Sequence, residues 1–70
     1  MKIFVNGRQT DIEGPVTVSR LLTLQEVKMP QMVSVELNGQ ILRPGQFEST
    51  LVTEGDNVEF IYFMGGGRWT

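Results

Sequence analysis

The 70-residue chain contains neither cysteine nor histidine. Without cysteine it can form no disulfide and has no thiol nucleophile, and without histidine it lacks the commonest general base and a usual zinc ligand. Glu54 and Asp56 have no partner base in the sequence, so we expect them to cap a turn rather than to transfer protons. The sequence therefore predicts a protein that is not an enzyme and that binds no cofactor or metal of its own.

Long hydrophobic runs and clusters of positive charge are also missing. The longest apolar run, residues 60–64, is too short to cross a bilayer, and the N-terminus shows no secretory signal pattern. Six basic residues against eight acidic ones give a net charge of −2, with no basic patch that could neutralise several phosphates. We therefore expect a cytoplasmic monomer that contacts neither nucleic acid nor membrane, and whose mild acidity suits a basic partner surface.

Two Asn-Gly dipeptides predict two tight hairpins, because this pair tolerates the positive φ angles that such turns require. Asn6-Gly7 would join a strand at residues 2–5 to a return strand at about residues 9–13. Asn38-Gly39 would join the alternating strand at residues 33–37 to a return strand at residues 41–42. Each hairpin is followed by a Gly-Pro or Pro-Gly pair, which predicts a break in the sheet.

A short helix is predicted between the two hairpins. Val18, Leu21 and Leu22 have the i, i+3, i+4 spacing of one helix face, and Thr17 is the expected N-cap. Pro30 disfavours helical geometry at the residue before it, so the helix should end by residue 25 or 26.

The last third of the chain predicts additional core residues and a final strand. Three apolar residues in the irregular stretch after the second hairpin are expected to fill the core: Phe47, Leu51 and Val52. The final strand, about residues 57–63, alternates between two faces. Its expected core side chains are Val58, Phe60 and Tyr62, and its opposite face carries Glu59, Ile61 and Phe63.

The order hairpin, helix, hairpin, strand predicts an α+β domain of the β-grasp, or ubiquitin-like, class. One main helix would cover one face of a mixed sheet of four to five strands, because a lone amphipathic helix must bury its apolar stripe. In this arrangement the first and last strands form a central parallel pair. The domain should span residues 1–64, followed by a flexible C-terminal tail at residues 65–70.

Four segments in order carry a family resemblance: KIFVNG at residues 2–7, VELNG at 35–39, EGDNVEF at 54–60, and Gly65-Gly66-Gly67. Together they resemble the ThiS family of sulfur carriers in thiamine biosynthesis, over residues 1–67. The resemblance implies that a ubiquitin-activating-like adenylating enzyme uses ATP to activate the carboxylate of Gly67, which Gly66 helps to present. A sulfur donor would then convert it to a thiocarboxylate that serves thiazole synthase or another acceptor enzyme.

The chain departs from this family pattern after Gly67, where a working member must end in glycine. Arg68, Trp69 and Thr70 follow instead. We therefore expect a precursor that is inert in sulfur transfer until a protease cuts after Gly67, unless the three residues are an expression remnant.

A docking surface is predicted on the face of the sheet that the helix leaves uncovered. Phe4, Ile61 and Phe63 should lie on this face beside the tail, and exposed contiguous apolar area marks interfaces. Together with Gly65 they are the expected contacts of the activating enzyme, although simple edge packing is the alternative explanation for these apolar residues.

Other functions remain compatible with the sequence. The chain could carry sulfur for molybdopterin, cysteine or homocysteine synthesis, or act as a protein modifier that forms isopeptide bonds, because a fold cannot distinguish acceptors. A function of another class is a plain interaction module with an idle tail, whose binding would be unaffected by mutation of Gly67.

Overall fold

The computed structural model describes residues 1–62 of the chain. In chain order the elements are β1 (Lys2–Val5), β2 (Arg8–Asp11), β3 (Val16–Thr17), α1 (Val18–Leu24), a 3-10 turn (Pro30–Met32), β4 (Val33–Leu37), β5 (Gln40–Leu42), a 3-10 turn (Pro44–Gln46), β6 (Leu51–Val52) and β7 (Asn57–Tyr62). Within this part of the chain no helix is long and apolar enough to pass through a lipid bilayer.

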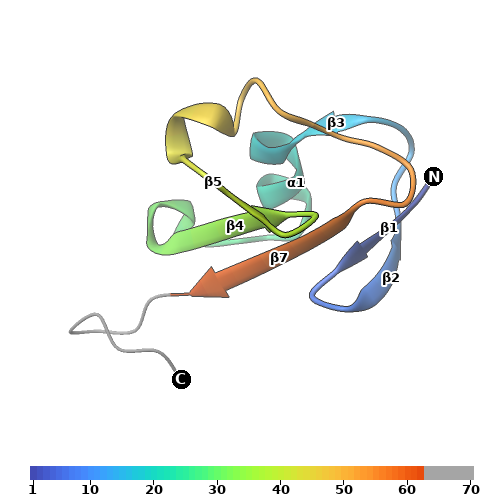
Figure 1. Cartoon of the computed structure of the whole chain (residues 1–70), viewed down its shortest axis with the longest axis horizontal. Coiled ribbons are helices and arrows are strands. Elements are labelled where there is room, and N and C mark those ends of the chain that lie inside the picture. The colour runs from blue at the N-terminus through green and yellow to red at the C-terminus, as the bar shows by residue number, and fades with distance from the viewer. Residues whose placement is uncertain (63–70) are drawn as a thin grey trace.

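Five strands form one mixed sheet in the order β2-β1-β7-β4-β5 (Figure 1). β1 and β7 run parallel, whereas the other neighbouring pairs are antiparallel. β7 is therefore the central strand, with β1 on one side and β4 on the other. The predicted mixed sheet with a parallel central pair is confirmed.

Both Asn-Gly turns have the predicted backbone geometry. Asn6 and Gly7 have φ angles of 52° and 80°, and Asn38 and Gly39 have 51° and 87°. Positive φ at both central residues is the geometry of the hairpin turn that matches the twist of its strands. The first return strand is β2, which ends at Asp11, two residues before the predicted end.

The helix begins as predicted but ends by a motif that the sequence did not reveal. The Thr17 hydroxyl accepts a hydrogen bond from the Arg20 backbone N–H at 3.0 Å, which makes Thr17 the N-cap. At the other end Glu26 has a φ of 58°, its N–H donates to the Thr23 carbonyl, and the Val27 N–H donates to the Leu22 carbonyl. This pair of bonds is a Schellman motif with glutamate in place of the usual glycine. The helix therefore ends well before Pro30.

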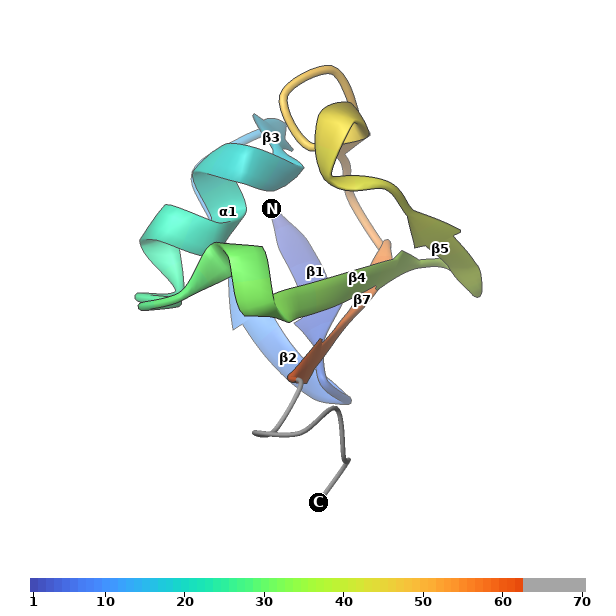
Figure 2. The same cartoon turned by 90° about the vertical axis from the view of Figure 1, so that its left-hand side faces the viewer.

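α1 lies over one face of the sheet (Figure 2), and the buried apolar residues of these elements form one core cluster. The helix contributes its predicted face, and the strands contribute alternate side chains. The buried apolar residues are Ile3, Val5, Ile12, Val18, Leu21, Leu22, Val33, Val35, Phe47, Val52, Val58 and Phe60. The opposite face of the sheet has no helix on it among residues 1–62.

A second, two-stranded sheet, which the sequence did not predict, changes the role of Leu51. β3 pairs with β6 so that Val16 lies opposite Val52 and Thr17 lies opposite Leu51. Because successive strand side chains point to opposite sides, Val52 is fully buried and Leu51 is 56% exposed. The prediction that Leu51 fills the core was wrong.

The prediction that Tyr62 belongs to the core was also wrong. Its side chain is 46% exposed, although it follows the alternation of Val58 and Phe60. Tyr62 pairs with Val33 at the start of β4, whereas β1 already ends at Val5, opposite Val58. The end of β7 therefore protrudes beyond its parallel neighbour. The proposed domain boundary at residue 64 and the tail at residues 65–70 lie outside the described residues.

Candidate functional site

The central strand β7 leads directly into the predicted reactive glycines. Its residues pair with β4 along its length, from Leu37 opposite Val58 to Val33 opposite Tyr62 (Figure 1). This antiparallel ladder anchors the strand up to its last residue. Phe63 and the three glycines of the predicted site, Gly65, Gly66 and Gly67, lie outside the described residues, so their roles remain predictions.

Two asparagine side chains hold β7 from the flanking hairpins. The Phe60 N–H donates to Asn6 Oδ1 at 2.8 Å, which replaces the strand partner that β1 no longer supplies. On the other side the Asn57 N–H donates to Asn38 Oδ1 at 2.9 Å, and Asn38 Nδ2 donates to Asp56 Oδ1 at 3.1 Å. Each asparagine thus forms its turn and also binds the central strand.

Sequence reasoning missed this second role. It assigned Asn6 and Asn38 to the turns alone, where glycine would satisfy the same φ requirement. The available signal was the choice of asparagine over glycine at both positions, because only asparagine adds an acceptor beside the neighbouring strand.

The acidic residues before β7 have the predicted structural role. Asp56 Oδ2 accepts from the Thr53 N–H at 2.8 Å and from the Thr53 hydroxyl at 3.3 Å. The carboxylate of Glu54 accepts from the Lys2 N–H at 3.2 Å. Both carboxylates are therefore used to fix the turn at the start of the central strand.

The open face of the sheet carries two of the predicted docking residues, but it does not bring them together. Phe4 of β1 lies opposite Asn57 of β7, so the two side chains share a face of the sheet. Asn57, Glu59 and Ile61 are alternate residues of β7 and point to this same face, as predicted. Phe4 and Ile61 are both half-buried. Asn57, the partner of Phe4, and Ile61 are four positions apart on β7, which corresponds to roughly 13 Å along the strand. Phe4 and Ile61 are therefore separate contacts rather than one contiguous patch.

Two glutamates lie next to each other on the same face. Glu36 of β4 lies directly opposite Glu59 of β7. A hydrogen bond with Glu59 raises the pKa of Glu36 above its ordinary value, with smaller contributions from desolvation and from the Glu59 charge. The open face is thus acidic at its centre.

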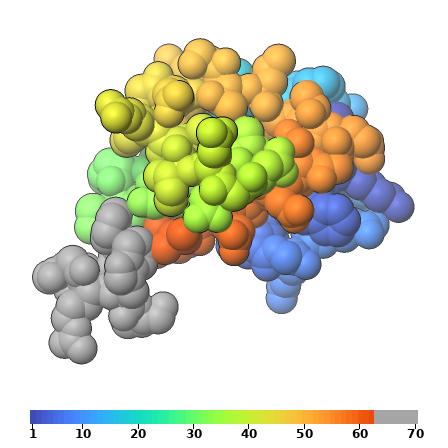
Figure 3. All heavy atoms as spheres, viewed as in Figure 1, coloured from blue at the N-terminus to red at the C-terminus, as the bar shows by residue number. Residues whose placement is uncertain are grey.

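The same face is hollowed between the two hairpin turns. The hollow has a volume of about 450 Å³ and is lined by Gly7, Glu36, Asn38, Gly39, Asn57 and Glu59. Figure 3 shows the orange atoms of β7 reaching the surface between the blue β1–β2 hairpin and the green β4–β5 hairpin.

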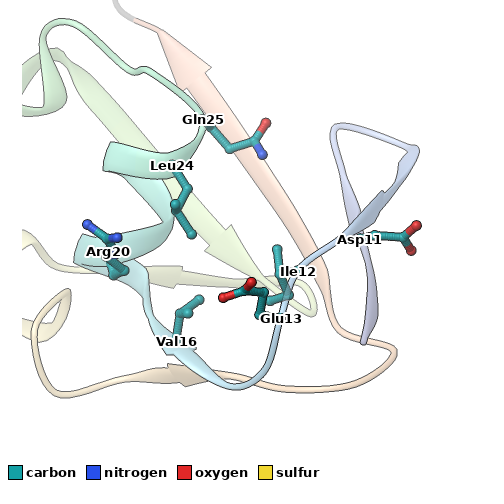
Figure 4. A pocket seen from close by; sticks show the side chains of 7 residues that line it. All are labelled: Asp11, Ile12, Glu13, Val16, Arg20, Leu24 and Gln25. Carbon is teal, nitrogen blue, oxygen red and sulfur yellow. The ribbon is translucent and has the colours of Figure 1, made fainter.

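A second hollow, of about 490 Å³, lies at the edge of the domain between α1 and the segment that follows β2. It is lined by Asp11, Ile12, Glu13, Val16, Arg20, Leu24 and Gln25 (Figure 4). None of the predicted site residues is among them, and the Asp11 side chain points away from the others. Within residues 1–62 no group of three acidic side chains is placed to hold a metal ion.

Comparison with known proteins finds a family model and solved structures that are similar to this chain. Residues 3–67 match the sequence model of the ThiS family, so the match includes the three glycines. A crystal structure of the thiamine biosynthesis protein ThiS from Geobacter metallireducens has 43% sequence identity and a TM-score of 0.86, over 96% of this chain and 100% of that one.

Two curated relatives are longer proteins. The thiazole synthase of Magnetococcus marinus is 32% identical over 97% of this chain, and that of Paramagnetospirillum magneticum is 33% identical over 96%. The chain spans only about a fifth of the length of these two relatives.

Proposed function

Because the chain belongs to the ThiS family of thiamine biosynthesis, we propose that it carries sulfur as a thiocarboxylate on Gly67 for thiazole formation. The observation that carries the proposal is the family match, which continues through the glycines to residue 67. The geometry supports it, because β7, the central strand that precedes these glycines in the sequence, pairs with β4 as far as Tyr62 and with β1 at its start.

The chemistry requires a partner that supplies ATP. A carboxylate is a poor acyl donor, so an oxygen of the Gly67 carboxylate first attacks the α-phosphorus of ATP and releases pyrophosphate. A persulfide sulfur then attacks the acyl carbon and releases AMP. This attack forms a C–S bond and leaves an acyl disulfide that keeps the S–S bond of the persulfide. A second thiol then attacks the donor's sulfur and breaks this S–S bond, which releases the thiocarboxylate and leaves the donor as a disulfide. The chain is the co-substrate in each step, and the adenylating enzyme is the catalyst.

Glycine suits the reacting end of the chain for two reasons. It has no Cβ, so it can pass a narrow channel and adopt φ angles closed to other residues. The five residues that follow Tyr62, up to Gly67, span at most roughly 17 Å when extended, which is enough to reach an enclosed site from the domain surface.

Thiazole synthase is the proposed acceptor. In the two relatives named thiazole synthase a segment like this chain is part of the same polypeptide, which supports a working partnership between the two. Residues 68–70 lie beyond the matched segment, and they would place a bulky Trp69 in a channel shaped for glycine. We therefore include a protease that cuts after Gly67 in the proposal.

The test compares three forms of the chain: full length, ending at Gly67, and ending at Gly67 with Gly67→Ala. Each is incubated with ATP, an adenylating enzyme active on ThiS-family proteins and a persulfide donor, and the intact masses are read. Only the form that ends at an unsubstituted Gly67 should show in good yield the mass increase expected when a carboxylate oxygen is replaced by sulfur, because adenylation tolerates little misplacement of the acyl carbon.

Two results would contradict parts of this proposal. Equal thiocarboxylate yield from the full-length chain would remove the need for cleavage. A thiocarboxylate that forms but does not support thiazole formation by thiazole synthase would assign the carrier to another sulfur pathway.

A further inference from the structure

The backbone of β7 has an open edge close to its C-terminal end. On the side of β1, the Asp56 carbonyl accepts from the Phe4 N–H at 2.9 Å and the Val58 carbonyl accepts from the Asn6 N–H at 2.8 Å. The Phe60 N–H then donates to the Asn6 side chain. Beyond this bond, no group within residues 1–62 pairs with the Phe60 carbonyl or the Tyr62 N–H.

These two groups point to the β1 side because of strand alternation. In an antiparallel pair, every second residue exchanges hydrogen bonds with one neighbour while the residues between face the other neighbour. Asn57 accepts from the Asn38 N–H on the β4 side, so Ile61 also faces β4, and Phe60 and Tyr62 face away from it. One side of the strand end is thus closed by β4 and the other is open.

The length of the tail determines what must cover this edge. Gly67 lies at most roughly 17 Å from Tyr62, and in the proposed reaction it enters an ATP site enclosed by the activating enzyme. The wall of that enzyme must therefore approach the end of β7. An open strand edge at an interface offers hydrogen bonds that remain unmade unless the partner supplies matching groups.

We infer that the adenylating enzyme adds an extended segment of its own chain to this edge. A carbonyl of that segment accepts from the Tyr62 N–H, and an N–H of the segment donates to the Phe60 carbonyl. Strand addition of this kind takes its affinity from main-chain hydrogen bonds and its specificity from alternate side chains. Asn6 fixes the register of the added segment on β7. Its side chain already binds the Phe60 N–H, so the first free groups along this edge are the Phe60 carbonyl and the Tyr62 N–H.

The inference rests on the proposed function and adds a way for the adenylating enzyme to hold the end of the domain. A partner strand paired with Tyr62 would keep β7 in strand geometry up to its last described residue. The side chains on either face of the strand end, half-buried Ile61 and half-exposed Tyr62, are available to contact the same partner.

The first test removes one hydrogen-bond donor from the edge. Tyr62→Pro deletes the N–H that faces the open side, and Tyr62→Ala is the matched control that loses the same aromatic ring but keeps the N–H. Both are made in the chain ending at Gly67, which keeps every helix and strand that the structure describes. The proline variant should raise the KM for adenylation by roughly fivefold over the alanine variant, the value of about one net hydrogen bond. Equal KM values in two folded variants would overturn the inference.

The second test observes the amide directly. Hydrogen exchange of the Tyr62 N–H, followed by NMR, should be fast in the free protein and slow by at least about tenfold in the complex with the adenylating enzyme. Exchange that stays fast in a complex that still forms adenylate would refute strand addition and leave the carrier function intact. A chain ending at Gly67 that forms no adenylate would refute both.

Discussion

Replacement of Asn6 should weaken the anchorage of the strand that presents the reactive end. In Asn6→Gly the turn keeps its geometry, because glycine readily adopts the φ of 52° observed for Asn6. The variant loses the Oδ1 acceptor of the Phe60 N–H, a bond of 2.8 Å to a residue that is 8% exposed.

The expected cost follows from these two changes. A buried donor left without a partner costs about 1–3 kcal/mol, and the added backbone freedom of glycine costs about 0.5–1 kcal/mol more. We expect the free energy of unfolding to fall by about 2 kcal/mol, which lowers the Tm of so small a domain by about 10 °C. Asn6→Asp keeps both an acceptor and tolerance of positive φ, so it should cost less than about 0.5 kcal/mol.

Urea denaturation and amide exchange measure the two consequences separately. The Phe60 amide should exchange faster in Asn6→Gly than in Asn6→Asp. Amides of the β4–β5 hairpin should also exchange faster in Asn6→Gly, but only by the factor that its lower free energy of unfolding accounts for. If both variants had the same stability and the same exchange rate at Phe60, Asn6 would be a turn residue only, and its proposed control of the register would fail.

Two further predictions concern the face of the sheet. The pKa of Glu36 is higher in the folded state than in the unfolded state. At pH values just above the ordinary carboxyl pKa, the folded state therefore binds more protons than the unfolded state, so the free energy of unfolding should fall as the pH rises through this range. Glu36→Gln should flatten this slope and be more stable than the unmodified chain near neutral pH, and a urea midpoint lower than that of the unmodified chain at neutral pH would contradict this account. Val58→Ser should lower the free energy of unfolding by about 3 kcal/mol or more, whereas Ile61→Ser on the open face should cost only about 1 kcal/mol and instead reduce kcat/KM for adenylation. Equal destabilisation by the two serine variants would show that the open face is wrongly assigned.

The sequence alone determined the features that depend on neighbours in the chain. Both hairpin turns follow from Asn-Gly, because that dipeptide accepts the two positive φ angles. The helix start follows from the hydroxyl of Thr17, and the core face of β7 follows from period-two alternation at Val58 and Phe60. The reactive role of Gly67 remains a prediction of sequence resemblance.

Only the tertiary structure decided where each strand ends relative to its neighbour. Tyr62 continues the buried alternation yet is exposed, because it lies past the end of β1. Leu51 is exposed because β6 pairs with β3, a contact between segments more than thirty residues apart that no local pattern indicates. Because β1 ends early, the Phe60 N–H bonds to the side chain of Asn6, and the Tyr62 N–H has no partner within residues 1–62. Local rules fix turns and periodicity, whereas the edges available to a partner depend on the lengths of strands that meet only in the folded chain.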